Sequence, residues 1–168
     1  RLHKAGISGV RTVSGDACEL DEVLTSFDAM LGEPALFDTV FIDAPCSGTG
    51  TMRRHPEIPW RLTENDVTCE LPKLQLTMLK EAAARVAAGG ELIYATCSVF
   101  DEENTQVVDA FLASPEGEGF AVAPLSEAQI LQLPDFSQAK KLVSVRQNDR
   151  GLFQSVPINA DSYDGHFC

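Results

Sequence analysis

Residues 37–48, Phe-Asp-Thr-Val-Phe-Ile-Asp-Ala-Pro-Cys-Ser-Gly, decide the fold of this chain. The first six are mostly β-branched or aromatic, which predicts a strand buried on both faces. The strand stops at Asp43-Ala-Pro45, and a loop rich in Gly, Thr and Pro runs from Cys46 to about Pro59. Strands of this kind belong to α/β proteins, in which helices cover a parallel sheet.

A second strand with a similar ending is expected at 91–95, and it leads into Thr96-Cys97-Ser98. Helices are expected at about 20–31, 71–88 and 102–113 from their apolar spacing. Short strands are expected at 10–13 and 120–122, a hairpin over 142–145 and 152–156, a surface loop over 124–139, and a last strand beginning at 165. Thr63 and Asp66 resemble a capping box with Asp in place of Glu. This alternation of strands and helices predicts an α/β fold.

The composition is that of a globular protein. The chain has 168 residues, of which 44% are hydrophobic and 23% charged, so it can bury one sizeable core. Its net charge of −12 argues against a stand-alone nucleic-acid binder, because phosphate binding depends on clustered Lys and Arg. Only Arg53-Arg54-His55 and Lys140-Lys141 form short basic clusters. No run approaches the roughly 20 apolar residues of a membrane span, and no secretory signal opens the sequence.

Five cysteines are present, at positions 18, 46, 69, 97 and 168. Their number is odd, no CxxC pair occurs, and the closest two are 23 residues apart, which suits neither a zinc site nor a disulfide framework. We therefore expect no metal and a reduced, intracellular protein. Each cysteine is then either a small buried apolar residue or a reactive thiol, and Cys18, Cys69 and Cys168 are assigned to the first class.

Cys46 and Cys97 each follow the carboxyl end of an expected strand. Ligands of open α/β sheets bind at this edge, so the two thiols are expected to converge there with Asp43 beside them. Three other interpretations stay open at this point. The thiols could be packed apolar groups, or one could serve a cysteine hydrolase with His55, the one histidine near either motif. Gly48-Thr-Gly50 could be a phosphate loop, although it lacks a third Gly and the Lys-Ser/Thr pair.

Three stretches of the sequence resemble the blocks of a known family. They are Asp43-Ala-Pro-Cys-Ser-Gly-Thr-Gly50 with Arg54-His-Pro-Glu57 and Trp60, then Leu92-Ile-Tyr-Ala-Thr-Cys-Ser98 with Glu102-Glu-Asn104, and finally Asp164-Gly-His-Phe167. They resemble the Sun/nucleolar-protein (RsmB-like) family of RNA cytosine-5 methyltransferases. The resemblance runs from about Gly9 onward, with His166 at a position where the family usually has an aromatic residue.

The resemblance implies a class I methyltransferase with a Rossmann-like α/β fold that uses S-adenosylmethionine. It implies methyl transfer to carbon 5 of a cytosine in rRNA or tRNA through a covalent Cys–cytosine intermediate. Cys97 is then the nucleophile, Cys46 helps to release the product, and Asp43 contacts the polar edge of the cytosine. The target base must be unstacked, so the expected partner is single-stranded RNA or RNA with a flipped cytosine.

The resemblance also implies binding residues. Asp16, at the end of the first expected strand, and Asp43 with Pro45 would contact S-adenosylmethionine. Arg53 and Arg54 would contact the RNA backbone, although a solvated pair of loop arginines is an equally good interpretation.

The chain departs from the family at its front. The first strand with its Gly-rich cofactor loop, and the second strand with its ribose-binding acid, have no counterpart, and residues 1–6 resemble the end of a helix. Residues 1–168 are therefore expected to be a partial catalytic domain, inactive by itself. A non-catalytic RNA- or protein-binding scaffold of the same ancestry, and a DNA cytosine methyltransferase with its nucleophile in the Pro-Cys block, stay open as alternatives. The sequence does not distinguish cytoplasm, nucleolus and mitochondrion, or the oligomeric state.

Overall fold

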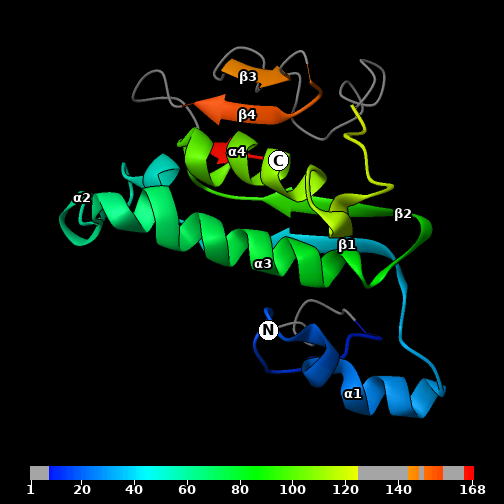
Figure 1. Cartoon of the computed structure of the whole chain (residues 1–168). Coiled ribbons are helices and arrows are strands. Elements are labelled where there is room, and N and C mark those ends of the chain that lie inside the picture. Colours follow the sequence, from blue (N-terminus) through cyan, green and yellow to red (C-terminus); the bar gives the residue numbers. More distant parts are fainter. Residues whose placement is uncertain (1–7, 125–143, 148–149, 157–164) are drawn as a thin grey trace.

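The computed structural model describes residues 8–124, 144–147, 150–156 and 165–168, and a parallel strand pair lies at its centre (Figure 1). Strand β1 spans Phe37–Asp43 and strand β2 spans Val86–Ala95. Their register pairs Thr39 with Glu91 and continues to Asp43 opposite Ala95. Both strands therefore end at the same edge of the sheet, and the two cysteine loops leave from that edge side by side.

Four α-helices are present in the described part of the chain: α1 (Leu20–Leu31), α2 (Ile58–Arg61), α3 (Leu71–Ala83) and α4 (Thr105–Leu112). A π-helical turn, η3 (Asp66–Glu70), runs directly into α3, and 3₁₀ turns lie at η2 (Thr49–Thr51), η4 (Asp101–Glu103) and η5 (Pro115–Gly117). A second, antiparallel sheet has the order β3 (Ser144–Gln147), β4 (Phe153–Val156), β5 (His166–Phe167). A bridge between Thr96 and Phe167 connects it to the end of β2.

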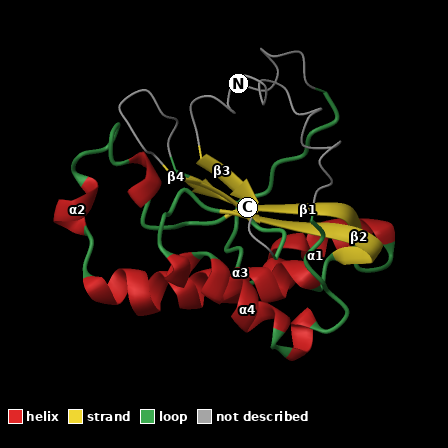
Figure 2. Ribbon diagram, turned by 90° about the horizontal axis from the view of Figure 1, so that it is seen from above, coloured by secondary structure: helices red, strands yellow, loops and turns green. Residues whose placement is uncertain are grey.

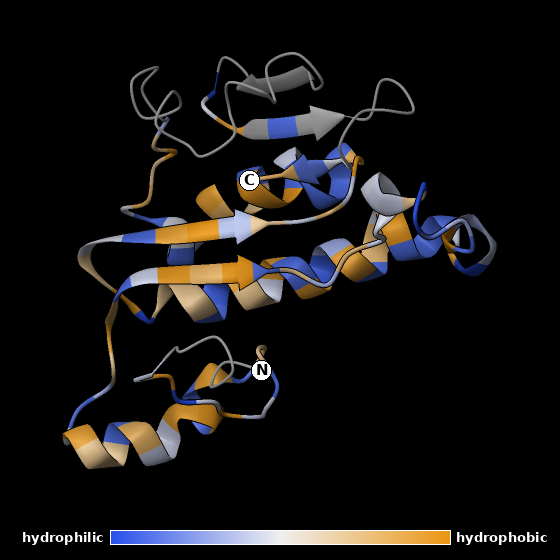
Figure 3. Ribbon diagram, turned by 180° about the vertical axis from the view of Figure 1, so that it is seen from behind, coloured by the Kyte–Doolittle hydropathy of each residue, from blue (hydrophilic) through white to orange (hydrophobic). Residues whose placement is uncertain are grey.

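The core lies on one face of the parallel strand pair. Figure 2 shows α3 and α4 on the same side of β1 and β2. Apolar side chains from these helices, the strands and the second sheet pack together there, among them Ile42, Leu79, Tyr94, Val107, Phe111 and Phe167. On the opposite face, which is nearest the viewer in Figure 3, Phe41 is 61% exposed. The expectation that β1 is buried on both faces is therefore wrong, because the described helices cover only one of them.

The expected helix over 71–88 ends earlier, at Ala83, and β2 begins at Val86 instead of 91. Arg85 accounts for the early end. Its carbonyl accepts the backbone N–H of Phe37 at 2.9 Å, and its buried guanidinium donates to Asp28 at 2.8 Å. Because Arg85 makes these bonds to β1 and α1, the chain leaves the helix after Ala83 and continues beside β1. Gly89, at φ +78°, then forms the irregular turn in β2 that restores pairing from Glu91 onward.

Two expected short strands are absent from the described residues. Val10 and Val13 are more than half exposed, and no described strand pairs with residues 10–13. Phe120 packs its ring edge against Phe111, with centroids 5.5 Å apart, and residues 120–122 form no strand. The helix expected at 102–113 begins as the turn η4 and becomes α-helical at Thr105.

Other expectations are confirmed. The first helix spans Leu20–Leu31 and stops at Gly32. β3 and β4 form the expected hairpin. The Thr63 backbone N–H donates to the Asp66 carboxylate at 2.8 Å and the Asp66 N–H donates to the Thr63 hydroxyl at 3.2 Å, which is a reciprocal capping box. The predictions for residues 1–6, for Lys140-Lys141 and for most of the loop at 124–139 concern residues outside the described ranges.

Candidate active site

The two motif cysteines meet at the edge where β1 and β2 end. The Cys46 and Cys97 sulfur atoms lie 3.3 Å apart, and the backbone N–H of Cys97 donates to the Cys46 sulfur at 3.3 Å. Both residues are half-buried, so the thiols touch each other and remain accessible. The expected convergence of the two thiols is confirmed. Cys18 and Cys69 are half-buried, whereas Cys168 is exposed and is therefore not the small buried apolar residue expected.

The two thiols differ in their surroundings. Burial, with the hydrogen bond to Cys97 as a second cause, raises the pKa of the Cys46 thiol to about 12. Cys46 therefore keeps its proton at neutral pH, and its S–H can point toward the Cys97 sulfur. A thiolate is the nucleophilic form of cysteine, so this arrangement favours Cys97 over Cys46 as the group that attacks.

A buried acid, Glu103, connects the two cysteine loops. Its side chain has no exposed surface. The Glu103 carboxylate accepts the backbone N–H of Ser47 at 2.8 Å, the hydroxyl of Ser98 at 2.5 Å and the side-chain amide of Gln75 at 3.0 Å. Ser47 follows Cys46 and Ser98 follows Cys97, so one side chain holds both loops. Sequence reasoning quoted Glu103 within a motif and gave it no role, because the sequence does not show which of two adjacent glutamates is buried.

A second set of buried hydrogen bonds fixes the backbone around Cys97. The Asn104 side chain accepts the Thr96 hydroxyl at 2.6 Å and donates to the Ser98 carbonyl at 3.0 Å. The Tyr94 hydroxyl donates to the Glu103 carbonyl at 2.6 Å, and burial raises the pKa of Tyr94. Cys97 thus sits between anchored neighbours, which restricts the positions that its sulfur can take.

Gly50 joins the first cysteine loop to the second by its backbone. Its N–H donates to the Cys97 carbonyl at 2.8 Å, and its carbonyl accepts the N–H of Gly165 at 2.8 Å. A Cβ at Gly50 would lie 2.1 Å from the Gly165 carbonyl oxygen, so this close approach requires glycine. The phosphate-loop interpretation fails at Gly50, because its N–H is already bonded. The cysteine-hydrolase interpretation also lacks support, since His55 pairs with Glu57 at 3.4 Å.

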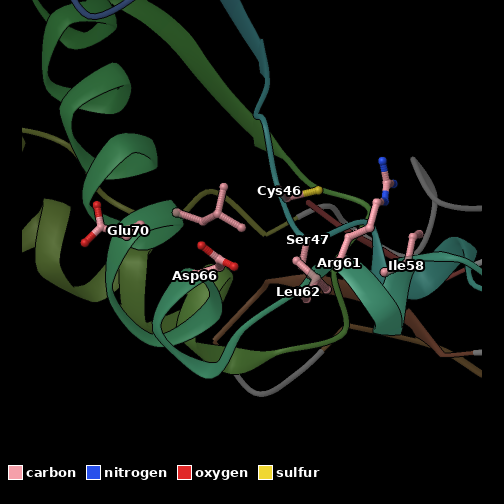
Figure 4. Close-up of a pocket in the computed structure, with 8 residues that line it drawn as sticks. Cys46, Ser47, Ile58, Arg61, Leu62, Asp66 and Glu70 are labelled. Carbon is pink, nitrogen blue, oxygen red and sulfur yellow. The ribbon is translucent and has the colours of Figure 1, made fainter.

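A cavity of about 290 Å³ opens beside Cys46 (Figure 4). Its walls come from the loop that contains Cys46, from α2 and the residue after it, from η3 and from the start of α3. The lining residues are Cys46, Ser47, Ile58, Arg61, Leu62, Asp66, Glu70 and Leu71. In Figure 4 the carboxylates of Asp66 and Glu70 stand on one side and the Arg61 side chain on the other. The cavity therefore offers both hydrogen-bond acceptors and a cation next to the thiol pair.

The remaining predicted residues separate into two groups. Asp43 and Pro45 are exposed at the carboxyl edge of β1, which is the edge where ligands of α/β sheets bind. Asp16 does not end a strand. It lies in a turn before α1, where its side chain accepts the Cys18 N–H at 2.9 Å, because residues 10–13 form no strand to place it at the sheet edge.

Arg53 and Arg54 are exposed in the loop that follows η2, consistent with either interpretation of them. Within the described ranges, no group of His, Cys, Asp and Glu side chains is placed to hold a metal ion. No described helix is long and apolar enough to cross a membrane.

The amino-acid sequence is similar to those of known proteins. Residues 1–156 match the family model for the 16S rRNA methyltransferase RsmB/F. The ribosomal RNA small subunit methyltransferase B of Klebsiella pneumoniae strain 342 is 45% identical over 95 residues, which cover 55% of this chain and 22% of that protein. The protein of the same name from Salmonella arizonae is 50% identical over 76 residues, covering 45% and 18%.

Two solved structures are similar in fold. The crystal structure of PH0851 superimposes with a TM-score of 0.74 and 29% identity, over 99% of this chain and 31% of that one. A methyltransferase homolog protein from Pyrococcus horikoshii gives a TM-score of 0.64 over 99% of this chain and 45% of that one; at 21% identity it shows the fold alone. The matched region thus spans about a fifth of the length of the curated relatives.

Proposed function

The chain belongs to the RsmB/F family of 16S rRNA methyltransferases and has the class I, Rossmann-like methyltransferase fold, and from this premise we propose that it carries the catalytic cysteines of an S-adenosylmethionine-dependent RNA cytosine-5 methyltransferase. The observation that carries the proposal is the 3.3 Å contact between the Cys46 and Cys97 sulfur atoms at the ends of two parallel strands. One cysteine at a strand end has many explanations, whereas two cysteines in contact match a reaction that makes and breaks a thioether.

Cys97 supplies the nucleophile. Carbon 5 of cytosine is a poor nucleophile, and addition of the Cys97 thiolate to carbon 6 moves electron density onto it. This covalent step divides one difficult reaction into two easier ones. Asp43, exposed at the end of β1, contacts the polar edge of the ring and makes the ring a better acceptor for the thiolate. S-adenosylmethionine, when bound, supplies the methyl group that carbon 5 accepts.

Cys46 acts on the release of the product. The resemblance allows two roles, a base for the carbon 5 proton or an aid to elimination. Because its pKa is raised to about 12, Cys46 suits the second role, in which its S–H donates a hydrogen bond to the departing Cys97 thiolate. In the elimination the proton on carbon 5 passes to water, the electrons of that C–H bond form the carbon 5–carbon 6 double bond, and the electrons of the carbon 6–sulfur bond return to the Cys97 sulfur, which restores the aromatic ring.

Asp43 and Pro45 are proposed to contact the cofactor at the carboxyl edge of β1, and Asp16 is retained as a further candidate contact. Calorimetric titration with S-adenosylhomocysteine tests this assignment. Binding at micromolar strength that weakens about tenfold or more in Asp43→Ala supports it. Equal affinity of the Asp43→Ala and unchanged chains would remove Asp43 from the cofactor site.

A non-catalytic scaffold of the same ancestry is the alternative from a different class. A scaffold has no use for a thiol pair whose loops are held by a fully buried carboxylate, so Cys46, Cys97 and Glu103 together argue against it. In a DNA cytosine methyltransferase the nucleophile would be Cys46, and the high pKa of its thiol argues against that assignment.

The test combines cysteine variants with denaturing electrophoresis of protein–RNA mixtures. The Cys97→Ala variant is expected to lose methyl transfer to 16S rRNA and to form no adduct. The Cys46→Ala variant is expected to retain attack but to accumulate a covalent adduct, because release is impaired. Cys69→Ala, a half-buried cysteine outside the site, is the control and should behave as the unchanged protein. Adduct formation that needs Cys46 and not Cys97 would reverse the assignment.

A further inference from the structure

Trp60 has an exposure that the fold does not explain. Its side chain is 89% exposed, the highest value among the exposed large hydrophobic residues that the structure describes, and it is the one tryptophan in the sequence. A tryptophan carries one of the largest apolar surfaces of any residue and gains most from burial. A ring left in solvent on an ordered segment therefore points to a partner that covers it.

The segment that presents Trp60 is well anchored. Trp60 lies in α2, whose first residue, Ile58, is only 5% exposed and fixes the helix to the domain. The backbone N–H of Trp60 donates to the Glu57 carbonyl at 3.1 Å, and the backbone N–H of Leu62 donates to the Ile58 carbonyl at 3.3 Å. In the loop that precedes α2, the carbonyl of Thr51 accepts the backbone N–H groups of Arg54 and His55. The Trp60 ring therefore projects into solvent from a helix that is fixed to the domain.

The sequence segment that contains Trp60 has a net charge opposite in sign to that of the whole chain. Residues 52–61 contain Arg53, Arg54 and Arg61, within a chain whose net charge is −12. The single acid in this segment, Glu57, is paired with His55 at 3.4 Å. A local concentration of arginines beside an exposed aromatic ring is the combination that binds single-stranded nucleic acid, in which cations contact phosphates and rings stack on bases.

The helix that carries Trp60 lies beside the cavity next to Cys46. Arg61, the next residue, and Ile58, on the same helix, line the cavity beside Cys46 that Figure 4 shows. Trp60 therefore lies in the helix that borders the cavity, while its own ring is exposed to solvent and does not line it. An RNA strand whose target base lies at Cys97 would place its neighbouring nucleotides near α2.

We propose that Trp60 is a stacking platform for an unpaired base next to the target nucleotide, in single-stranded RNA whose phosphates are contacted by the arginines of 52–61. The identity of the RNA strand as substrate rests on the proposed function. Because every base has a π-face, Trp60 selects an unpaired strand and contributes little to the choice of base sequence. The platform thereby holds the substrate in the open form that attack by Cys97 requires.

Tryptophan fluorescence tests the contact directly, because Trp60 is the single fluorophore of its kind in this chain. Titration with a single-stranded RNA oligonucleotide is expected to quench the emission, with the same midpoint as the rise in anisotropy of end-labelled RNA. A fully paired RNA duplex of the same length should quench much less. RNA binding without quenching, equal quenching by the duplex, or no RNA binding at low salt would each overturn the proposal.

Variants of Trp60 and Arg61 distinguish the contribution of base stacking to RNA affinity from the contribution of charge. Trp60→Ala should weaken binding about tenfold or more, and Trp60→Tyr, which keeps an aromatic face, should restore most of the affinity. The slope of log affinity against log salt should stay constant in Trp60→Ala and become shallower by about 0.7 in Arg61→Gln, the value for one phosphate contact on a single strand. Phe41→Ala, which removes an exposed aromatic from the open face of β1, is the control and should bind as the unchanged chain does.

The result also separates this proposal from the proposed function. Quenching that persists in Cys97→Ala, together with the absence of any adduct in Cys46→Ala, would support the stacking platform and contradict the methyltransferase assignment. Adduct formation at normal rates in Trp60→Ala, with unchanged affinity for RNA, would do the opposite.

Discussion

The carboxylate of Glu103 accepts the backbone N–H of Ser47 at 2.8 Å, across 56 residues of sequence. The same carboxylate accepts the Ser98 hydroxyl, so the residues that follow the two cysteines share one buried partner. Glu103 is therefore a positioning residue: it touches neither sulfur, and it fixes the separation of the loops that carry them.

Replacement of Glu103 by glutamine should impair both the fold and the reaction. Glu103→Gln turns one acceptor oxygen into an NH₂ group that faces other donors, at a cost of about 1–3 kcal/mol in the free energy of unfolding. Urea denaturation measures that cost. Adduct formation at Cys97 should slow at temperatures where the variant is still folded, because the loops lose their common anchor. Glu102→Gln is the control, since its partly exposed side chain should tolerate the change. Equal adduct rates in the two variants would remove Glu103 from the positioning role.

The raised pKa of Cys46 predicts a specific dependence of stability on pH. The folded pKa of about 12 exceeds the ordinary thiol value of 9.0, so between these values the unfolded chain holds fewer protons on Cys46 than the folded chain. The stabilisation is complete below pH 9 and is lost as the pH rises toward 12. Urea unfolding between about pH 8 and pH 10.5 should show a steeper loss of stability in the unchanged protein than in Cys46→Ala. Parallel curves would contradict a protonated Cys46. Burial and Glu103, the two larger causes of the raised pKa of Tyr94, are present in both proteins, and Cys46 is the third cause.

The Arg85 contacts should stabilise the junction between α1, α3 and β1. The Arg85 side chain is buried and donates to Asp28 at 2.8 Å and to Asp21 at 2.7 Å. Arg85→Ala should lower the free energy of unfolding by about 2 kcal/mol, and Arg85→Lys by less, because lysine keeps the charge and loses the planar fork. Chemical denaturation at neutral pH measures both.

Two controls accompany the Arg85 variants. Lys80→Ala removes the exposed ion pair with Glu116 and should change stability by less than about 0.5 kcal/mol. The hydrogen bond from the Ala35 N–H, and then Arg85, lower the pKa of Asp28, so the Asp28 contribution should disappear as the pH falls below about 4. An Arg85→Ala variant as stable as Lys80→Ala would contradict the account of why α3 ends at Ala83.

The capping box at the start of the long helix should contribute measurably. Thr63→Ala removes the hydroxyl that accepts the Asp66 N–H and should cost about 1 kcal/mol in unfolding free energy. A double-mutant cycle with Asp66→Ala should be non-additive, because each change removes the partner of the other. Thr77→Ala, an exposed threonine within α3, is the control and should be nearly neutral. Additive effects at Thr63 and Asp66 would mean that the two residues act independently.

The sequence sufficed for the site's outline, because the outline follows from local patterns. Two apolar strands that each end in a cysteine motif had to meet at one edge if they were parallel neighbours, and Cys46 and Cys97 do meet. The capping box and the β3–β4 hairpin were also predictable, since each depends on residues close together in sequence.

The rest depends on contacts between distant residues. The helical apolar spacing continues past Ala83, and the helix nevertheless ends there because Arg85 bonds to α1 and β1. Residues 10–13 have the composition of a strand and find no strand partner among the described residues. Glu103 and Glu102 are alike in sequence, and only the folded chain distinguishes the fully buried one.

The central claim is that Cys97 attacks the cytosine while Cys46 releases the product. The most direct measurement is peptide mapping by mass spectrometry of the adduct between the unchanged protein and RNA that carries 5-azacytidine at the target position. We predict that the nucleotide is attached to the peptide that contains Cys97, and that Cys46 is recovered as an unmodified thiol. An adduct on Cys46, with Cys97 unmodified, would contradict the account.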